Sequence, residues 1–259
     1  MIRAKKHFGQ NFLKDRIVLE KIIQAISKDT KFIVEIGPGL GDLTQELLKI
    51  SRVKAIEIDE DLIPFLRQKF KEQLASANLT LLNADASKLF EQGLDENQYF
   101  LVANLPYYVA SNLILSALKD KKCLGLIVMV QKEVALKFCA KAGDSDFSAL
   151  GVLSSLICEK EFLFEVPAHC FEPAPKVTSA VMMLKKECEF EEICDIKSFE
   201  KFLRASFKAP RKTLLSNLKA YKTELLELFK ALNLKENIRP HELCAKSYLK
   251  LFQNLKDSL

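Results

Sequence analysis

A glycine-rich turn, Glu35-Ile36-Gly37-Pro38-Gly39-Leu40-Gly41, is the feature that most restricts what this chain can fold into. An apolar run at residues 32–36 leads into the turn, and leucines recur behind it at helical spacing: Leu43, Leu47 and Leu48. The pattern is therefore strand, glycine turn, helix. It predicts an α/β sheet in which the turn lies at a helix N-terminus.

The spacing of the glycines argues against a dinucleotide. A pyrophosphate-binding turn has the form Gly-x-Gly-x-x-Gly, whereas here the third glycine comes one residue early and Asp42 occupies the last position. S-adenosylmethionine has no phosphate, and its sulfonium and amine tolerate acidic neighbours such as Glu35 and Asp42. Each carboxylate also has a structural interpretation, for Asp42 as a helix cap or a first-turn charge.

Acidic residues follow the next two predicted strands. The strand at 53–58 ends in Glu57-Ile58-Asp59, about twenty residues after the turn, where a carboxylate can bind both ribose hydroxyls. We assign that role to Glu57, because Asp59 begins a predicted helix at 60–74 and an N-cap explains it equally well. A strand at 79–82 leads to Asp85, which either accepts the adenine amino group of the cofactor or is a solvated loop carboxylate.

Asn104-Leu105-Pro106-Tyr107 follows an apolar run at 99–103 and suits an exocyclic amine. The amino nitrogen of adenine is a weak nucleophile because its lone pair is delocalised into the ring. The Asn104 side-chain oxygen and the Leu105 carbonyl can each accept one N–H and localise that lone pair, while Tyr107 stacks on the ring. Pro106 fixes φ and donates no competing N–H. The motif predicts N6 methylation of adenine, with a plain proline turn as the alternative.

The basic charge is concentrated in the last quarter of the chain. Residues 197–259 contain 14 Lys and Arg against 6 Asp and Glu, whereas residues 1–196 contain 25 against 28. The densest basic cluster includes Arg211 and Lys212, and Arg3, Lys5 and Lys6 form a second patch. Lys and Arg that neutralise phosphates bring affinity without sequence information, which suits docking on a large folded RNA.

Strand and helix patterns alternate as far as residue 184 and become helical after it. The later strands are predicted at 124–130, 151–157 and 177–184, and the terminal helices at 199–207, 213–219, 223–232 and 241–255. We therefore predict two domains, with residues 1–185 as the catalytic α/β domain and 186–259 as a helical RNA-binding domain.

Lys6-His7-Phe8-Gly9-Gln10-Asn11-Phe12-Leu13 closely resembles the opening signature of the ribosomal RNA adenine dimethyltransferase family. Segments 35–44, 57–59, 85–86, 104–107 and 171–180 also fall in the family's order and spacing. The resemblance covers nearly the whole chain and implies a Rossmann-like class I S-adenosylmethionine-dependent methyltransferase sheet with a small C-terminal all-helical domain. It implies cofactor contacts from Asn11, Leu13, Gly37, Gly39, Glu57, Asp85, Ala86 and Asn104.

The resemblance also implies a place for the substrate. A Phe before a Pro-x-Pro run is by itself more often a core anchor, but the family uses an aromatic at the position of Phe171 to hold the flipped adenine opposite Tyr107. Lys176 is then expected to meet RNA phosphate. Together with Arg211 and Lys212, these are the predicted substrate-binding residues.

Within the family, segments 206–214 and 237–243 resemble the branch that modifies the small subunit. That branch is expected to dimethylate two adjacent adenosines near the 3′ end of 16S rRNA in the small ribosomal subunit or its precursor. Antibiotic-resistance enzymes of the large subunit and a non-catalytic assembly factor are the alternatives. Tyr108, where the family commonly has Asn, departs from the pattern, as do Ala209-Pro210 and His241-Glu242.

The cysteines and histidines bear on the cellular compartment and on whether the chain binds a metal. The 7 cysteines show no Cys-x-x-Cys spacing and the 3 histidines no ligand spacing, so we predict a reducing compartment and no metal site. No signal or membrane-spanning run is apparent, which predicts a cytoplasmic enzyme without membrane contact. No obligate protein partner is evident.

Overall fold

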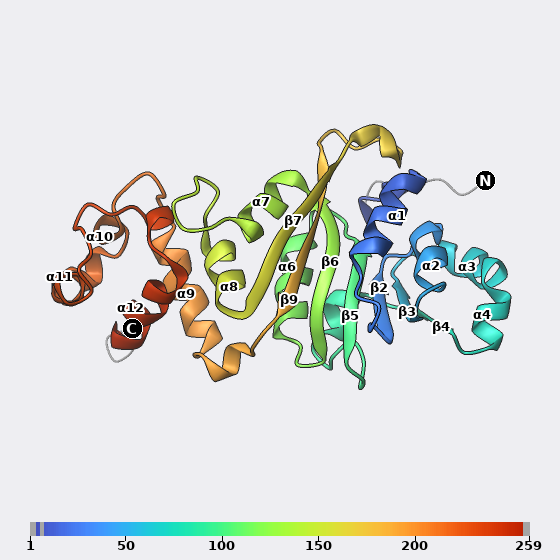
Figure 1. The fold of residues 1–259 in the computed structure, drawn as a ribbon, viewed down its shortest axis with the longest axis horizontal. Coiled ribbons are helices and arrows are strands. Elements are labelled where there is room, and N and C mark those ends of the chain that lie inside the picture. Colours follow the sequence, from blue (N-terminus) through green and yellow to red (C-terminus); the bar gives the residue numbers. More distant parts are fainter. Residues whose placement is uncertain (1–3, 6–7, 256–259) are drawn as a thin grey trace. The chain divides into compact units, whose positions relative to one another are not determined.

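The computed structural model describes residues 4–5 and 8–255 of the chain (Figure 1). It divides into two compact units, which are Met1–Ala135 with Glu161–Lys186 and Leu136–Lys160 with Glu187–Leu259. The predicted domains, 1–185 and 186–259, differ from these units in where residues 136–160 belong. No helix in the described part of the chain combines the length and apolar character needed to cross a membrane.

The first unit is built on a seven-stranded sheet in the order β4-β3-β2-β5-β6-β9-β7. Strands β2 to β6 pair in parallel, and β9 runs antiparallel to β6. The strands are β2 (Phe32–Ile36), β3 (Arg52–Glu57), β4 (Leu79–Asn83), β5 (Tyr99–Asn104), β6 (Cys123–Gln131), β7 (Cys158–Val166) and β9 (Ser179–Lys186). The order reverses at β2, which has β3 on one side and β5 on the other, and such a switch point is where open α/β sheets bind ligands.

Helices and short segments connect these strands. They are α1 (Arg16–Ala25), α2 (Asp42–Leu47), α3 (Ile63–Lys69), α4 (Lys71–Ala75), α5 (Ala86–Leu89), α6 (Ala110–Lys119) and α7 (Lys132–Cys139). A two-stranded ribbon pairs β1 (Phe12–Leu13) with β8 (Phe171–Glu172). The helix predicted at 60–74 is interrupted, because a 3₁₀ turn at Glu60–Leu62 precedes α3 and Phe70 separates α3 from α4. Asp59 caps that turn through the Asp61 N–H, as the N-cap interpretation expects.

The strand predicted at 151–157 is wrong, because the chain there forms helix α8 (Ala149–Ile157) in the second unit. A short segment rich in apolar residues does not distinguish a buried strand from a buried helix. Gly151 lets α8 pack closely, since an added Cβ would lie 2.8 Å from the Phe147 ring and 3.0 Å from the Lys137 carbonyl. The strand of the sheet is the following segment, β7.

Helices and aromatic rings form the second unit. Its later helices are α9 (Ile196–Ser206), α10 (Leu214–Asn217), α11 (Lys222–Ala231) and α12 (Ala245–Leu255). Phe199 and Phe202 of α9 face Phe252 of α12, with ring centroids 5.1 Å and 5.8 Å apart. Tyr248 is fully buried and donates its hydroxyl to the Pro240 carbonyl over 2.8 Å. The predicted helical character of this region is confirmed.

Candidate active site

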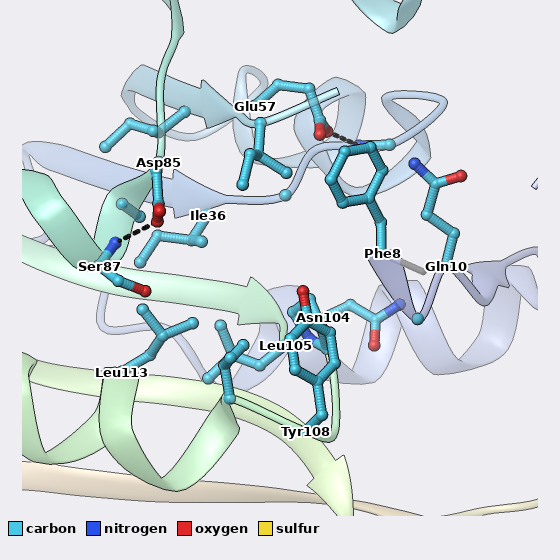
Figure 2. A pocket seen from close by; sticks show the side chains of 18 of the residues that line it. Phe8, Gln10, Ile36, Glu57, Asp85, Ser87, Asn104, Leu105, Tyr108 and Leu113 are labelled. Atoms are coloured by element: carbon cyan, nitrogen blue, oxygen red, sulfur yellow. Dashed lines mark hydrogen bonds between the residues drawn. The ribbon is translucent and has the colours of Figure 1, made fainter. Parts of the chain in front are cut away.

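A cavity of about 230 Å³ opens at the carboxyl ends of the parallel strands of the first unit. Figure 2 shows Glu57, Asp85 and Asn104 around it, each from the end of a different strand. Its predicted lining residues are Asn11, Gly37, Gly39, Glu57, Asp85, Ala86, Asn104, Leu105, Pro106 and Tyr107. Residues more than ninety positions apart in the sequence therefore meet at the switch point of the sheet, as a ligand site requires.

The glycine turn forms one wall of the cavity. Gly37, Gly39 and Gly41 have φ of 72°, 58° and 75°, a conformation in which a side chain is strained. An added Cβ at Gly39 would lie 2.9 Å from the Phe12 ring, whereas one at Gly37 would meet nothing within 4 Å. Gly37 thus leaves the cavity open beside its backbone. A bound ligand can therefore approach that backbone closely.

Glu57 connects the turn to the end of β3. One carboxylate oxygen accepts from Gly39 N–H over 3.1 Å and the other from Asp59 N–H over 2.9 Å. Burial raises the pKa of this carboxyl, and the Asp59 and Gly39 N–H groups offset part of that rise. A carboxylate held by two backbone donors keeps further lone pairs as acceptors, so it suits the two ribose hydroxyls expected at this place.

Asp85 lies across the cavity at the start of α5. Its Oδ1 accepts from Ser87 N–H over 2.9 Å, so the side chain is the N-cap of the helix. The capping bond uses one carboxylate oxygen, which leaves the other as an acceptor for the predicted contact with an amino group. Ala86, the next residue, is buried and lines the same cavity.

The Asn104–Tyr107 segment forms the opposite wall. Asn104 Nδ2 donates to the Asn11 carbonyl over 2.9 Å, and this bond leaves the side-chain oxygen as an acceptor. Leu105 is buried, and its N–H donates to the Met129 carbonyl of β6 over 3.0 Å. The Tyr107 hydroxyl lies 2.6 Å from Ser179 Oγ, which holds the ring in place. Asn104, Leu105 and Tyr107, the residues to which the motif assigns the two acceptors and the stacking face, therefore line one cavity.

The structure does not bring every predicted residue to the cavity. Leu13 and Phe171 are each 5% exposed, belong to the hydrophobic core and pair with one another across the β1–β8 ribbon. Phe171 therefore packs in the core outside the cavity lining, as the core-anchor interpretation expects, and its stacking on adenine stays a prediction. Lys176 is exposed and lies outside the lining of the cavity. Lys6 and His7 of the opening signature lie outside the described residues.

Other lining residues were missed by the sequence interpretation. Phe8 and Gln10 line the cavity together with Asn11 and Phe12, so the N-terminal segment 8–12 covers the cavity more fully than predicted. Tyr108 is 63% exposed and also lines it, with its ring against Gly9, where an added Cβ would lie 3.3 Å away. The signal for Gln10 was its place within the signature, and for Tyr108 its departure from the family pattern.

Asp42 and Glu35 do not line the cavity. Asp42 lies in the first turn of α2, where its carboxylate is 2.6 Å from Lys14 Nζ and 3.6 Å from Lys69 Nζ, which confirms the first-turn interpretation. Glu35 is 1% exposed within β2, and burial raises the pKa of its carboxyl to about 8. Glu35 is therefore mainly protonated in the folded protein at neutral pH.

We expect Glu35→Gln to flatten the pH dependence of stability. In the unfolded chain the carboxyl ionises above its ordinary value of 4.5, whereas in the folded protein it ionises only near 8. The folded state therefore loses stability relative to the unfolded chain as pH rises from 4.5 to 8, by about 1.4 kcal/mol per pH unit. Denaturant titrations at several pH values test this. Equal slopes in both proteins over that window would contradict the assignment.

The sheet order, the open glycine turn and the acidic end of β3 define the class of protein. The donors and acceptors fit a nucleoside bearing an amino acid group, because Gly37 leaves room beside the backbone and Glu57 and Asp85 supply acceptors for hydroxyl and amino groups. The chain has the fold of class I S-adenosylmethionine-dependent methyltransferases. A model of the family described as "Ribosomal RNA adenine dimethylase" matches residues 1–257, and the chain belongs to that family.

Curated relatives match along almost the whole chain. "Ribosomal RNA small subunit methyltransferase A" of Campylobacter jejuni (strain RM1221) is 62% identical over 99% of this chain and 97% of its own length. The protein of the same name from Campylobacter curvus (strain 525.92) is 54% identical over 99% of this chain and 94% of its own length. The enzyme class expected from the sequence, an S-adenosylmethionine-dependent ribosomal RNA adenine methyltransferase, is confirmed.

Solved structures agree with this assignment. A dimethyladenosine transferase from Plasmodium falciparum superposes with a TM-score of 0.79 at 27% identity, covering 95% of this chain and 98% of that one. The 23S rRNA methyltransferase ErmE superposes with a TM-score of 0.73 at 25% identity, covering 95% of this chain and 100% of that one.

Proposed function

We propose that this enzyme methylates N6 of two adjacent adenosines near the 3′ end of 16S rRNA, in the small ribosomal subunit or its precursor, giving N6,N6-dimethyladenosines. The observation that carries the chemistry is the Asn104 amide, whose NH2 is bonded to the Asn11 carbonyl at the edge of the cavity. The choice of the small subunit is supported by the names of the curated relatives. Because the proposed substrate is a ribosomal subunit or its precursor, we place the enzyme in the cytoplasm.

The proposed residue roles follow from the hydrogen-bonding capacity of the wall. Asn104 Oδ1 and the Leu105 carbonyl accept the two N–H groups of the adenine amine and draw the nitrogen toward tetrahedral geometry. Pro106 leaves this edge without a competing N–H, and Tyr107 holds the ring by stacking while Ser179 fixes its hydroxyl.

S-adenosylmethionine supplies the methyl group as an electrophile on a sulfonium. Glu57, Asp85 and the open backbone at Gly37 orient it, so that the chain contributes mainly positioning. Methylation leaves N6 cationic, and such a nitrogen is acidic enough to release its proton to water. The chain therefore needs no side-chain base.

We propose that the second unit docks on the RNA backbone. Arg211 and Lys212 are exposed and line a hollow there with Asn237 and Arg239. Leu214 N–H donates to the Ile238 carbonyl over 2.8 Å, and this bond joins the segment that carries Arg211 and Lys212 to the one that carries Arg239. Arg239 was missed as a member of this cluster, because it is distant from Arg211 in sequence.

Replacing Arg211 and Lys212 together by Ala should weaken binding to small-subunit particles and reduce its salt dependence. Each lost phosphate contact lowers the slope of log K against log salt by about 0.7 to 0.9. Filter binding across a salt series measures this. Lys230→Ala with Lys250→Ala removes the same charge from exposed helix faces of the second unit and should leave the slope unchanged. An equal change in both double variants would contradict a specific docking surface.

The proposed function is tested by methyl transfer from labelled S-adenosylmethionine to unmodified small-subunit particles, with large subunits in parallel. Digestion and mass spectrometry identify the modified nucleotides. We expect dimethyladenosine in the small subunit alone. Label on the large subunit would shift the assignment toward the 23S rRNA methylation for which ErmE is named, and tight particle binding without label would favour an assembly factor that has lost its chemistry.

A further inference from the structure

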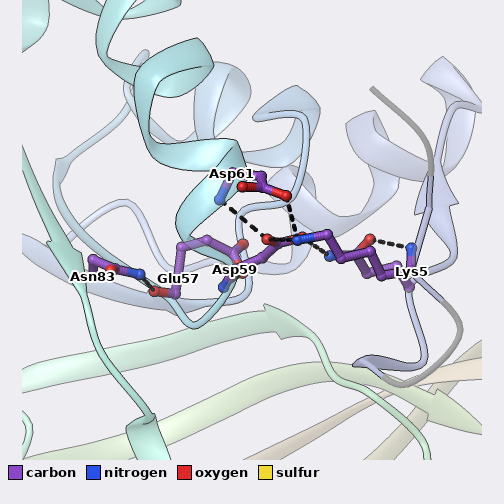
Figure 3. A network of polar contacts seen from close by, with 6 residues as sticks. Lys5, Glu57, Asp59, Asp61 and Asn83 are labelled. Carbon is purple, nitrogen blue, oxygen red and sulfur yellow. Dashed lines mark hydrogen bonds and ion pairs between the residues drawn. The ribbon is translucent and has the colours of Figure 1, made fainter. Parts of the chain in front are cut away.

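Lys5, Gln10, Asp59 and Asp61 form one polar cluster beside the cavity, which we call the clasp (Figure 3). Lys5 Nζ lies 2.6 Å from Asp59 Oδ1 and 2.6 Å from Asp61 Oδ2. Gln10 Nε2 donates to Asp59 Oδ2 over 2.8 Å, and Gln10 Oε1 accepts from the Lys5 backbone N–H over 2.7 Å. Lys5 therefore forms ion pairs within the protein, although its sequence neighbours suggested a basic patch.

Asp59 joins the clasp to the wall of the cavity. Its side chain is 2% exposed and bonds to the opening segment, while its backbone N–H donates to Glu57 Oε1 over 2.9 Å. Figure 3 shows Lys5 and Glu57 on opposite sides of this residue. Although burial acts to raise it, the bonds from Lys5 and Gln10 hold the pKa of Asp59 below its ordinary value. The carboxylate is thus ionised across the neutral range.

Hydrogen bonds hold the N-terminal segment 8–12 at both of its ends. At the start, the clasp holds Gln10, and Phe8 N–H donates to the Lys5 carbonyl over 3.1 Å. At the far end, the Asn11 carbonyl accepts from Asn104. Every residue of the segment 8–12 lines the cavity. A ligand inside it is therefore covered by a strip of backbone held to one wall by the clasp and to the other by Asn104.

We propose that the clasp residues are positioning residues for S-adenosylmethionine, which hold segment 8–12 across the cavity and thereby set how fast the cofactor leaves. The proposal rests on the assignment of this cavity to the cofactor. The clasp bonds are polar and ionic, so they can break and re-form as the segment opens, whereas its last residue, Phe12, begins the β1–β8 ribbon, which is anchored in the core. Opening at the clasp is thus the lower-cost route for exchange.

The test uses S-adenosylhomocysteine, the demethylated cofactor, with the full-length protein. In Lys5→Met we expect its dissociation rate, measured by stopped-flow displacement, to rise about fivefold with little change in the association rate. Lys14→Met is the matched control, because Lys14 also forms a 2.6 Å ion pair, with Asp42, and is 38% exposed against 30% for Lys5. Neither Lys14 nor Asp42 lines the cavity, so the control should leave both rates unchanged.

Three further readouts separate the clasp from general stabilisation. Lys5→Arg keeps the charge and should restore the slow dissociation. Adding Asp59→Asn to Lys5→Met should raise the rate by less than the product of the two single effects, because both residues act through one contact. In the cofactor-free protein, hydrogen exchange at Gly9 and Asn11 should quicken in Lys5→Met and stay unchanged in Lys14→Met.

A dissociation rate in Lys5→Met equal to that in Lys14→Met would overturn the proposal. A lower melting temperature without faster dissociation would overturn it as well, since it would assign Lys5 a purely structural role. The pocket assignment is checked separately with Gly37→Ala. If that variant binds S-adenosylhomocysteine as the unmodified protein does, the cavity itself is wrongly assigned, whatever Lys5 does.

Discussion

Asn104→Ala should lower kcat for methyl transfer by about a thousandfold while leaving binding to small-subunit particles intact. Removing one preorganised hydrogen-bonding group from a catalytic site costs about a hundredfold to a thousandfold in rate, and here the lost group polarises the nucleophile itself. The particle should still bind, because the proposed docking residues Arg211 and Lys212 belong to the second unit. Single-turnover methylation and filter binding measure the two effects.

Asn104→Asp is the matched control for this prediction. It retains an acceptor oxygen at the same place but cannot donate to the Asn11 carbonyl, to which Asn104 Nδ2 is bonded over 2.9 Å. We expect a smaller loss of rate in Asn104→Asp than in Asn104→Ala. Undiminished turnover in Asn104→Ala would refute the acceptor role of the side chain.

Gly37→Ala should weaken S-adenosylmethionine binding by about a hundredfold. An added Cβ meets no protein atom within 4 Å and stands beside the cavity, so it occupies space that the cofactor needs. Overpacking of this kind costs about 1–3 kcal/mol. Isothermal calorimetry with the cofactor measures the loss.

Gly143→Ala separates this steric effect from backbone strain. Gly143 has a φ of 100°, an added Cβ there also meets nothing within 4 Å, and it lies outside the cavity. Both variants should lose about 1–2 kcal/mol of stability from a side chain at positive φ, but only Gly37→Ala should lose cofactor affinity. Equal cofactor binding in the two variants would contradict the assignment of this cavity to the cofactor.

Much of the parallel sheet is predictable because local pattern and tertiary environment agree there. The run at 32–36 is apolar, punctuated by glycine and followed by helical spacing, and it is buried in the middle of the sheet as β2. The segment at 151–157 shows where that reasoning ends. It is also a short segment rich in apolar residues but folds as α8, because its burial comes from packing against α9 and α12 rather than from strand neighbours.

Some site residues could likewise be identified from the sequence, and others could not. Glu57 and Asp85 were identifiable because each lies at the carboxyl end of a strand, and the carboxyl ends of parallel strands meet at one edge of a sheet. Phe171 was not, because nothing in its neighbourhood says whether a ring faces a cavity or the core, and the structure buries it against Leu13.

By itself, the sequence determined the class of the protein, since the glycine turn, the acidic strand ends and Asn104-Leu105-Pro106-Tyr107 carry chemistry that depends on residue type and short spacing. Only the tertiary structure decided which atoms act together. The bond from Asn104 to Asn11 and the clasp of Lys5 on Asp59 join residues 93 and 54 positions apart. Such contacts depend on how strands and segments are placed in space, and no local pattern in the chain encodes that placement.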